Sequence, residues 1–137
     1  MRDDRPLKLI RRTPVDGEHV ARLEALAEVA DAVAANAGKD LQSEFGKQHV
    51  ALIIGCNQFA RFYRDGEHAG RIELWLTPEA VAELEAAGGQ VTDAVGGAVF
   101  QMFGWRLVDP TAMPEAVEAA LKAAAGRALT SVSTTAF

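Results

Sequence analysis

Hydrophobic and polar residues alternate in the middle of the chain in the manner of β-strands. Residues 58–64 and 71–76 both place aliphatic side chains on one face and charged or aromatic side chains on the other, because successive strand side chains point to opposite sides. The Asp65-Gly66 dipeptide between them suits a tight reversal. The pattern predicts a hairpin with one face on a core and the other nearer water. The inner face is expected to hold Ala60, Phe62, Ile72, Leu74 and Leu76, and the outer face Arg61, Tyr63, Arg71, Glu73 and Trp75.

A further strand is predicted directly before this hairpin. Residues 49–54 are apolar on both faces, as in a strand that is buried on both sides. Gly55-Cys56-Asn57 then interrupts the run as a bend or bulge would. We expect the three strands to form an antiparallel meander, which the polar segment 39–47 leads into.

Helical spacing marks the first long segment of the chain. Apolar residues recur every three or four positions from Val20 to Ala34, with acidic residues on the opposite side. Asp16 is a suitable N-cap for this helix, and Gly38 is a suitable residue to end it.

Two more helices are predicted after the meander. Thr77 as N-cap and Pro78 in the first turn begin one, which Gly88-Gly89 ends. An alanine-rich helix is expected over 114–125, ended by Gly126. Between the two helices, residues 90–97 resemble a loop, and residues 98–103 and 105–108 are expected to be strands.

The order of these elements predicts an α+β fold, with helices packed on one face of a mostly antiparallel sheet, because hairpins rather than crossover helices join the strands. At 137 residues the chain is expected to be a single domain, 1–137. The arm 1–15, with a short strand expected over 7–10, and the tail 128–137 are expected to be peripheral. The uncharged tail is a candidate to pair with a sheet edge, in this subunit or a neighbour.

Composition narrows the classes of function. A net charge of −5 argues against a general phosphate-binding surface, although five basic residues against two acidic ones in 1–13 give the arm a local positive charge. That arm is expected to be a solvated terminus rather than a binding element. The single cysteine excludes an intramolecular disulfide and fits a reducing compartment. No apolar run approaches the ~20 residues of a membrane span, so we expect a cytoplasmic protein without membrane contact.

Two segments, 16–22 and 65–71, share the pattern D-G-E-H-x-x-R. Brought together, they would offer Asp, Glu and His ligands for a divalent metal. Asp-Gly is also a common dipeptide at helix starts and hairpins, and the flanking sequences do not continue the similarity, so chance is favoured. No metal site and no cofactor are predicted.

No catalytic constellation is evident. Cys56 follows a glycine bend, but a nucleophilic cysteine needs a base, and His49 lies at the far end of the preceding strand. An inert core cysteine is the favoured interpretation. No glycine-rich phosphate loop precedes a helix. A binding role is therefore favoured over an enzymatic one.

The outer sheet face carries the main candidate site. Arginines interleaved with aromatic residues can stack on bases or rings and bridge anions. The same residue types also form cross-strand salt bridges on a sheet, or a homodimer surface. The structural and dimer uses are favoured over ligand contact. The candidate ligand or nucleic-acid residues are Arg61, Tyr63, Arg64, Arg71, Trp75 and Arg106.

Over residues 39–127 the chain resembles the MmcQ/YjbR-like family of small bacterial α+β proteins with a frataxin-like (CyaY-like) double-wing fold. The resemblance rests on Phe45-Gly46 and on the runs IIGCNQFARFYRDG, LWLTPEAVAEL, GWRLVD and EAVEAALKAA. LKLIRRTP and TSVSTTAF have no counterpart in the family, and Gln58 stands where a lysine is usual. The resemblance implies a fold and a label of DNA binding, with no catalytic residues to carry over.

The sequence thus predicts a small binding module that contacts nucleic acid or a small anionic or aromatic ligand through the Arg/aromatic sheet face. The first alternative is a homodimeric interaction protein without a small-molecule site. A metal-dependent enzyme built on the paired D-G-E-H segments is the least favoured alternative.

Overall fold

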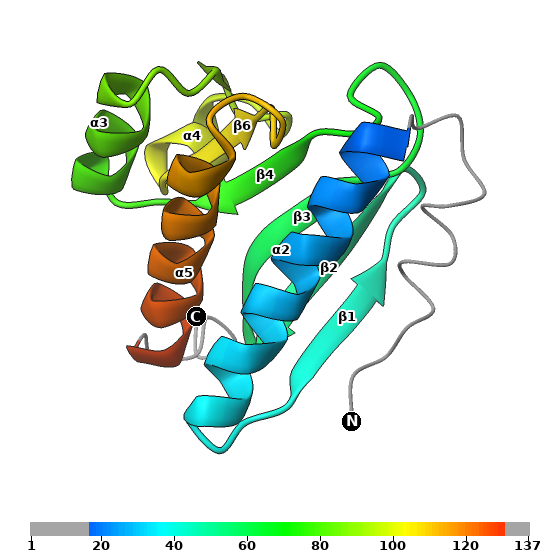
Figure 1. The fold of residues 1–137 in the computed structure, drawn as a ribbon, viewed down its shortest axis with the longest axis vertical. Coiled ribbons are helices and arrows are strands. Elements are labelled where there is room, and N and C mark those ends of the chain that lie inside the picture. The colour runs from blue at the N-terminus through cyan, green and yellow to red at the C-terminus, as the bar shows by residue number, and fades with distance from the viewer. Residues whose placement is uncertain (1–16, 131–137) are drawn as a thin grey trace.

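The computed structural model describes residues 17–130, and these residues form helices and one six-stranded antiparallel sheet (Figure 1). The sheet order is β1-β2-β3-β4-β6-β5. The predicted α+β class is confirmed. The strand expected over 7–10, the cap Asp16 and the tail beyond Thr130 lie outside the described residues. The elements are α2 (Gly17–Asn36), β1 (Leu41–Phe45), β2 (His49–Ile54), β3 (Asn57–Tyr63), β4 (Ile72–Trp75), α3 (Pro78–Ala86), β5 (Val91–Thr92), α4 (Ala98–Met102), β6 (Trp105–Val108) and α5 (Pro114–Thr130).

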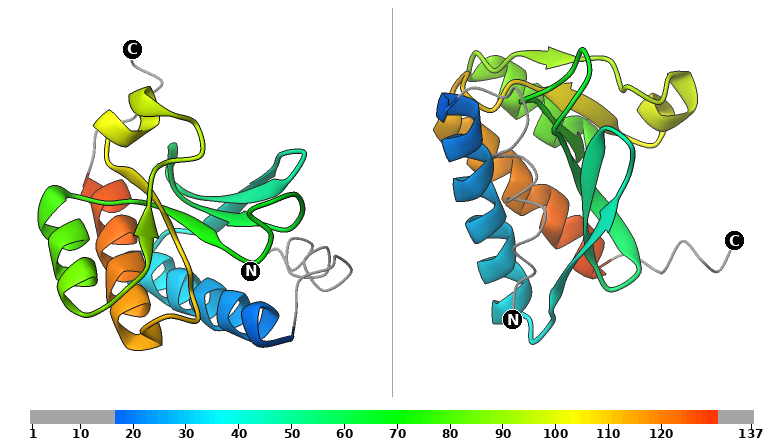
Figure 2. Two further views of the ribbon diagram at one scale, coloured as in Figure 1. Left: turned by 90° about the horizontal axis from the view of Figure 1, so that it is seen from above. Right: turned by 90° about the vertical axis from the view of Figure 1, so that its right-hand side faces the viewer.

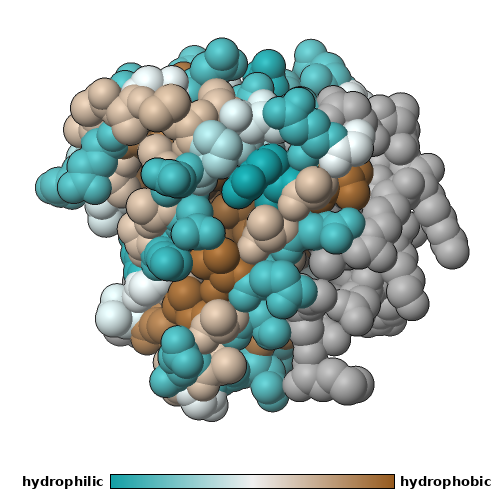
Figure 3. Space-filling view, viewed as in Figure 1, coloured by the Kyte–Doolittle hydropathy of each residue, from teal (hydrophilic) through white to brown (hydrophobic). Residues whose placement is uncertain are grey.

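Two long helices, α2 and α5, cover one face of the sheet, and α4 lies on the other side (Figure 2). Helix α3 packs beside α5. Figure 3 shows apolar side chains reaching the surface along the junction of α2 and α5. We call the side under α2 and α5 the inner face and the opposite side the outer face.

The inner face is the apolar core, as the alternation predicts. Cross-strand pairing sets Ala60 opposite Leu74 and Phe62 opposite Ile72, so that their side chains share one side of the sheet. All four, and Leu76, are at most 1% exposed. Helices α2 and α5 complete the core with small and branched residues, namely Leu23, Leu26, Ala27, Ala30, Ala34, Val117, Ala120, Leu121, Ala124, Ala125 and Ala128.

The predicted meander is present, and its first turn differs in detail from the expectation. Gly55 and Cys56 form a two-residue turn in which Gly55 has a φ of +67°, and Asn57 already belongs to β3. The bulge lies in the strand itself, between Leu52 and Ile53. Cys56 is exposed at this turn, so the expectation of a core cysteine is wrong. The side chain of Cys56 therefore lies at the surface rather than in the core.

The sequence did not indicate β1. Among its residues only Leu41 is buried, and the others are polar or exposed, so the segment lacks the apolar alternation of a half-buried strand. Pairing with β2 from Leu41 opposite Ile54 to Phe45 opposite Val50 nevertheless places it in the sheet. An edge strand is stabilised by its ladder of hydrogen bonds and tolerates polar side chains on both faces.

The strand expected over 98–103 is wrong, because Ala98–Met102 is the short helix α4. Periodicity alone does not distinguish a short apolar run in a helix from one in a strand. Gly97, with a φ of +87°, precedes the helix. Strand β6 then begins at Trp105 as predicted.

Helix α5 continues through Gly126 to Thr130, beyond the predicted end. Ala128 is buried, and its carbonyl accepts a hydrogen bond from Asn57 Nδ2 at 3.1 Å. Tertiary packing of the last turn therefore outweighs the ~1 kcal/mol by which a helical glycine is disfavoured.

Candidate functional site

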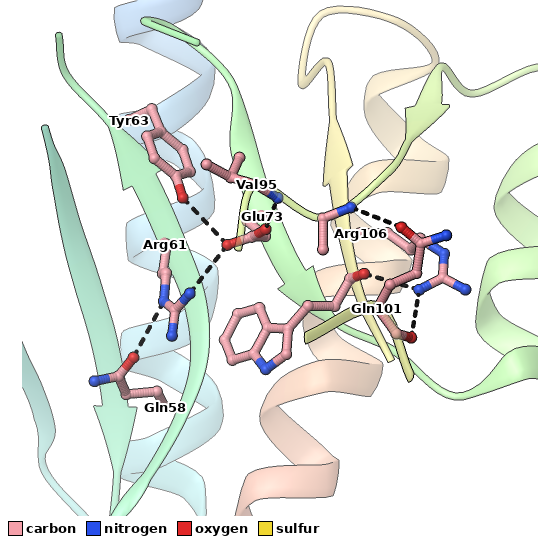
Figure 4. A network of polar contacts seen from close by, with 9 residues as sticks. Gln58, Arg61, Tyr63, Glu73, Val95, Gln101 and Arg106 are labelled. Atoms are coloured by element: carbon pink, nitrogen blue, oxygen red, sulfur yellow. Dashed lines mark hydrogen bonds and ion pairs between the residues drawn. The ribbon is translucent and has the colours of Figure 1, made fainter. Parts of the chain in front are cut away.

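A buried carboxylate, Glu73 on β4, lies at the centre of the outer face. Its side chain is 0% exposed. Its Oε1 accepts hydrogen bonds from Arg61 Nη1 and Tyr63 Oη, both at 3.2 Å, and its Oε2 accepts one from the Val95 backbone N–H at 2.7 Å (Figure 4). A buried charge is tolerated when it is paired and hydrogen-bonded. Two strands and the loop after β5 are thus joined at one side chain.

Arg61 supplies the positive charge from the directly opposite position on β3. Its Nε donates to Gln58 Oε1 at 3.2 Å. Its guanidinium carbon lies 4.5 Å from the centre of the Trp105 ring and 5.0 Å from that of the Phe100 ring, a cation–π arrangement. The side chain is 15% exposed. Contacts within the molecule therefore engage most of this guanidinium, and little of it is left to bind a ligand.

Tyr63 completes the network as a neutral donor. Burial, and secondly the negative charge of Glu73, raises the pKa of Tyr63 to about 12. Its ring lies 5.5 Å from the His49 ring and 5.8 Å from the His68 ring, measured between centroids. Burial and the charge of Arg61 lower the pKa of His49. Tyr63 therefore stays protonated at neutral pH, as a donor to Glu73 must.

The outer face was expected to lie nearer water, and this expectation is wrong for its centre. Glu73 and Tyr63 are both buried, and residues 93–103, which we call the α4 segment, cover Glu73. The alternation correctly separates the two faces. It carries no information about what covers each one.

Hydrogen bonds at several points hold the α4 segment in place. Gln101 is central to them: its Oε1 accepts from the Ala94 N–H at 3.1 Å, and its Nε2 donates to Asp93 Oδ1 at 3.2 Å. The Gln101 carbonyl accepts from Arg106 Nη1 at 2.8 Å. Trp75 Nε1 donates to the Phe103 carbonyl at 2.9 Å. The segment is therefore fixed along its length, although it is short and lies at the surface.

The α4 segment exposes several large hydrophobic side chains. Its exposed large hydrophobic residues are Val95 (40%), Val99 (60%), Phe100 (37%), Met102 (76%) and Phe103 (61%), which we call the α4 apolar surface. Elsewhere in the described part of the chain, the only large hydrophobic residues that are similarly exposed are Phe45 and Met113. No charged residue occurs between Asp93 and Arg106. Soluble proteins rarely expose such a cluster without a binding role.

The six candidate residues do not form one surface. Arg61 and Tyr63 meet at Glu73. Arg64 Nη2 donates to the carbonyls of Gly46 and Lys47 at 3.1 and 2.9 Å and so fixes the β1–β2 turn. Arg71 lies near Asp109, and its charge is one of the influences that lower the pKa of that carboxyl.

Arg106 lies on the side opposite to the one expected. The register sets it opposite Leu74, so it shares the inner face, and it lines a cleft beyond the end of β4. Trp75 lies at the end of β4. The guanidinium carbon of Arg127 lies over its ring, 4.0 Å from the ring centroid. No motif singles out Arg127, which lies on α5 far along the chain from its partners.

The two D-G-E-H segments do come close together. The backbone of Gly70 lies against the His19 ring, since a Cβ at Gly70 would be 3.1 Å from His19 Cδ2. His19 Nε2 is 3.4 Å from Asp109 Oδ1, and His68 Nε2 is 3.4 Å from Glu67 Oε1. Within residues 17–130, no group of three or more His, Cys, Asp or Glu side chains is arranged to hold a metal ion. The two segments therefore meet in a packing contact between Gly70 and His19.

Comparison with known proteins gives no match among family models, curated proteins or solved structures. The resemblance to the MmcQ/YjbR-like family stays a prediction. In the described range 17–130, none of the helices is both long and apolar enough to cross a membrane.

Proposed function

We propose that the protein is an interaction module that forms a homodimer through the α4 apolar surface. The observation that supports this proposal is the gathering of Val95, Val99, Phe100, Met102 and Phe103 on one exposed segment. Aromatic residues and methionine are enriched at protein–protein interfaces, and charged residues are depleted at their centres. The α4 apolar surface has this composition.

A second copy of the chain is the partner that the charge distribution favours. A two-fold interface brings a patch against itself, so any charge at its centre meets the same charge on the partner. Residues 94–105 carry no charge, whereas the whole chain carries −5. Two copies joined at this surface keep their net negative charge away from the contact. Two negatively charged molecules with a neutral apolar patch associate best through that patch.

The anchoring of the α4 segment favours binding. A surface that is rigid before association loses less conformational entropy when it binds. The bond from the Val95 N–H to Glu73 and the bond from Trp75 to the Phe103 carbonyl hold the two ends of the apolar surface on the sheet. The buried Glu73 network then has a functional consequence, because it holds the interface residues in a fixed arrangement.

The first prediction from the sequence, contact with nucleic acid or a small ligand through the outer sheet face, has less support. Arg61 is paired with Glu73, and Arg64 binds backbone carbonyls, so two of the proposed cationic contacts are engaged within the molecule. Nucleic-acid affinity comes from clustered free cations. Titration with duplex DNA at two salt concentrations tests this alternative, and salt-sensitive binding would restore it.

Sedimentation equilibrium of the full chain tests the homodimer. The wild type is expected to sediment with twice the 14.6 kDa mass of one chain. Val99→Glu places a charge in the centre of the α4 apolar surface and is expected to sediment as the monomer. Met113→Glu is the matched control, because Met113 is an exposed methionine outside the α4 segment, and it is expected to remain dimeric. A monomeric wild type, or a dimeric Val99→Glu variant, would refute the proposal.

A further inference from the structure

A cleft of about 280 Å³ opens beyond the end of β4, between α3, α4 and α5. Its volume is close to the lower end of the range for small-molecule sites. Its lining is formed by Leu76, Pro78, Val81, Gln101, Met102, Phe103, Gly104, Arg106 and Arg127. The outer-face network around Glu73 does not contribute to it.

Two arginines give this cleft a positive charge. Arg127 Nη1 donates to the Leu76 carbonyl at 2.9 Å, and Arg106 Nη1 donates to the Gln101 and Trp105 carbonyls at 2.8 Å each. Neither guanidinium forms an ion pair with a carboxylate among residues 17–130, and no acidic residue lines the cleft. Each is thus oriented through one nitrogen and keeps its charge without a counter-ion in this part of the chain.

Arg127 is also partly removed from water. Its guanidinium lies over the Trp75 ring at 4.0 Å, and burial lowers the pKa of Arg127. A partly desolvated cation interacts more strongly with an anion than a fully hydrated one does. The position of this guanidinium is therefore favourable for binding an anionic group.

The remaining walls are apolar. Leu76, Val81, Met102 and Phe103 contribute hydrocarbon and aromatic surface beside the two guanidinium groups. Such a combination suits a ligand with one charged end and an apolar body. A guanidinium presents paired N–H groups that match the two oxygens of a carboxylate.

Gly104 allows these groups to come together. A Cβ at this position would lie 2.2 Å from the Leu76 carbonyl oxygen and 2.9 Å from Arg127 Nη1, and its φ of +105° is one that glycine adopts readily. The Gly104 carbonyl in turn accepts the Leu76 N–H at 2.9 Å. The close approach at Gly104 lets the Arg127 guanidinium line the cleft next to the Leu76 carbonyl.

We propose that this cleft binds a small monocarboxylate with an apolar body, its carboxylate between Arg106 and Arg127 and its body against Val81, Met102 and Phe103. Hexanoate and benzoate are suitable probes of this class. The site does not require the homodimer. Met102 and Phe103 belong to both surfaces, so an occupied cleft is expected to influence association as well.

Titration of the full chain with hexanoate, followed by amide chemical shifts in NMR spectra, tests the site. The amide signals of Leu76, Phe103 and Gly104 are expected to move, and the shifts are expected to give a dissociation constant below about 10 mM. Hexanol carries the same hydrocarbon body without the carboxylate and is the ligand control. Absence of these shifts, or equal shifts of the same amides with hexanol, would overturn the proposal.

Variants locate the site and separate it from the homodimer. Arg127→Gln and Arg106→Gln are each expected to weaken hexanoate binding about tenfold or more, because each removes a charge-assisted contact. Arg22→Gln is the control, since Arg22 lies on α2 outside this cleft and is expected to leave binding unchanged. Undiminished binding by both cleft variants would contradict the assignment. Val99→Glu, which lies outside the cleft lining, is expected to bind hexanoate as a monomer, so the ligand site is tested even if the wild type does not dimerise.

Discussion

The two faces of the sheet are both buried at their centres, but they are buried by different means. On the inner face, Phe62 and Leu74 pack against α2 and α5 through apolar contacts alone. On the outer face, Glu73 is covered by the α4 segment and bonded to Arg61, Tyr63 and the Val95 N–H. Apolar burial is non-directional, whereas a buried carboxylate requires each partner at a defined position.

This difference separates stability from positional specificity. An apolar face accepts many neighbours of suitable volume. The Glu73 carboxylate accepts the Val95 N–H at one place, and thereby fixes where the α4 apolar surface lies on the sheet. The inner face is thus expected to contribute most to folding, and the outer face to determine the position of the binding surface.

The largest expected effect comes from removing the outer-face carboxylate. Glu73→Leu leaves the Arg61 charge without its partner in a mostly buried site and should lower the free energy of unfolding by about 3–5 kcal/mol. The double variant Arg61→Met/Glu73→Leu should be less destabilised than Glu73→Leu, since no charge is left unpaired. Urea denaturation measures both.

A matched control for this series is Glu83→Leu, at an exposed position on α3, which should unfold like the wild type. If Glu73→Leu also unfolded like the wild type, the outer face would not depend on its ionic network, and the contrast between the faces would fail.

The next largest effect is expected at the junction between β4 and β6. Gly104→Ala introduces a Cβ 2.2 Å from the Leu76 carbonyl oxygen at a φ of +105°, and should cost roughly 2 kcal/mol or more. Gly126→Ala is the control, because Gly126 lies inside α5 with nothing within 4 Å of the added atom, and it should stabilise the protein by about 0.5–1 kcal/mol. Thermal unfolding of the two variants should therefore shift in opposite directions. Equal shifts would show that the close approach at Gly104 has no energetic consequence.

A smaller and more specific effect is expected in the titration of Tyr63, the single tyrosine of the chain. Absorbance of the phenolate should report a pKa of about 12, above the ordinary value of 10, because burial and Glu73 disfavour the charged form. The folded state holds this proton more tightly than the unfolded state does. The associated stability is therefore complete below pH 10 and is lost as the pH rises from 10 toward 12.

The same titration in Glu73→Leu should give a lower pKa than in the wild type, since one of its two main causes is removed. A wild-type tyrosine that ionised near pH 10 would mean that the phenol is exposed to water. It would then not be the buried donor in the network.

The smallest effect is expected at Asp109, at the rim of the sheet. Burial raises the pKa of this carboxyl. The hydrogen bonds from the Thr111 hydroxyl and N–H, together with the charges of His19 and Arg71, lower the pKa by more than burial raises it, so the net shift is downward. A lowered folded pKa stabilises the protein above the unfolded value near 3.8, and this contribution is lost as the pH falls through the folded value. Wild type and Asp109→Asn should differ in stability at pH 7 and converge below pH 3.8. A gap that widened on acidification would contradict the assignment.

The sequence predicted the parts of the fold that depend on local pattern. The alternation around Ile72 and Leu74 assigned both sheet faces, and Thr77-Pro78 located the start of α3, where the Thr77 hydroxyl accepts the Ala80 N–H at 3.2 Å. The missing parts depend on tertiary partners. Strand β1 is specified by its pairing with β2, and α4 by its position over the outer face.

The candidate site was predicted less well, for a related reason. Arg61 and Tyr63 were identified correctly as outer-face residues, but the group that joins Glu73 to the α4 segment is a backbone N–H, at Val95, which has no side-chain signal in a sequence. Arg127 contacts Leu76 and Trp75 only because α5 packs across the end of β4. Such contacts between segments that are distant in the sequence follow from the topology of the fold rather than from any local motif.

Hydrogen exchange at the Val95 amide is the most direct test of the claim that Glu73 anchors the α4 apolar surface. In the wild type this amide should exchange slowly, although Val95 itself and the residues that follow it are exposed, because it donates to a buried carboxylate. In Glu73→Leu it should lose more protection than the amides of β3 lose. A wild-type Val95 amide that exchanged as fast as an unstructured one would contradict the account.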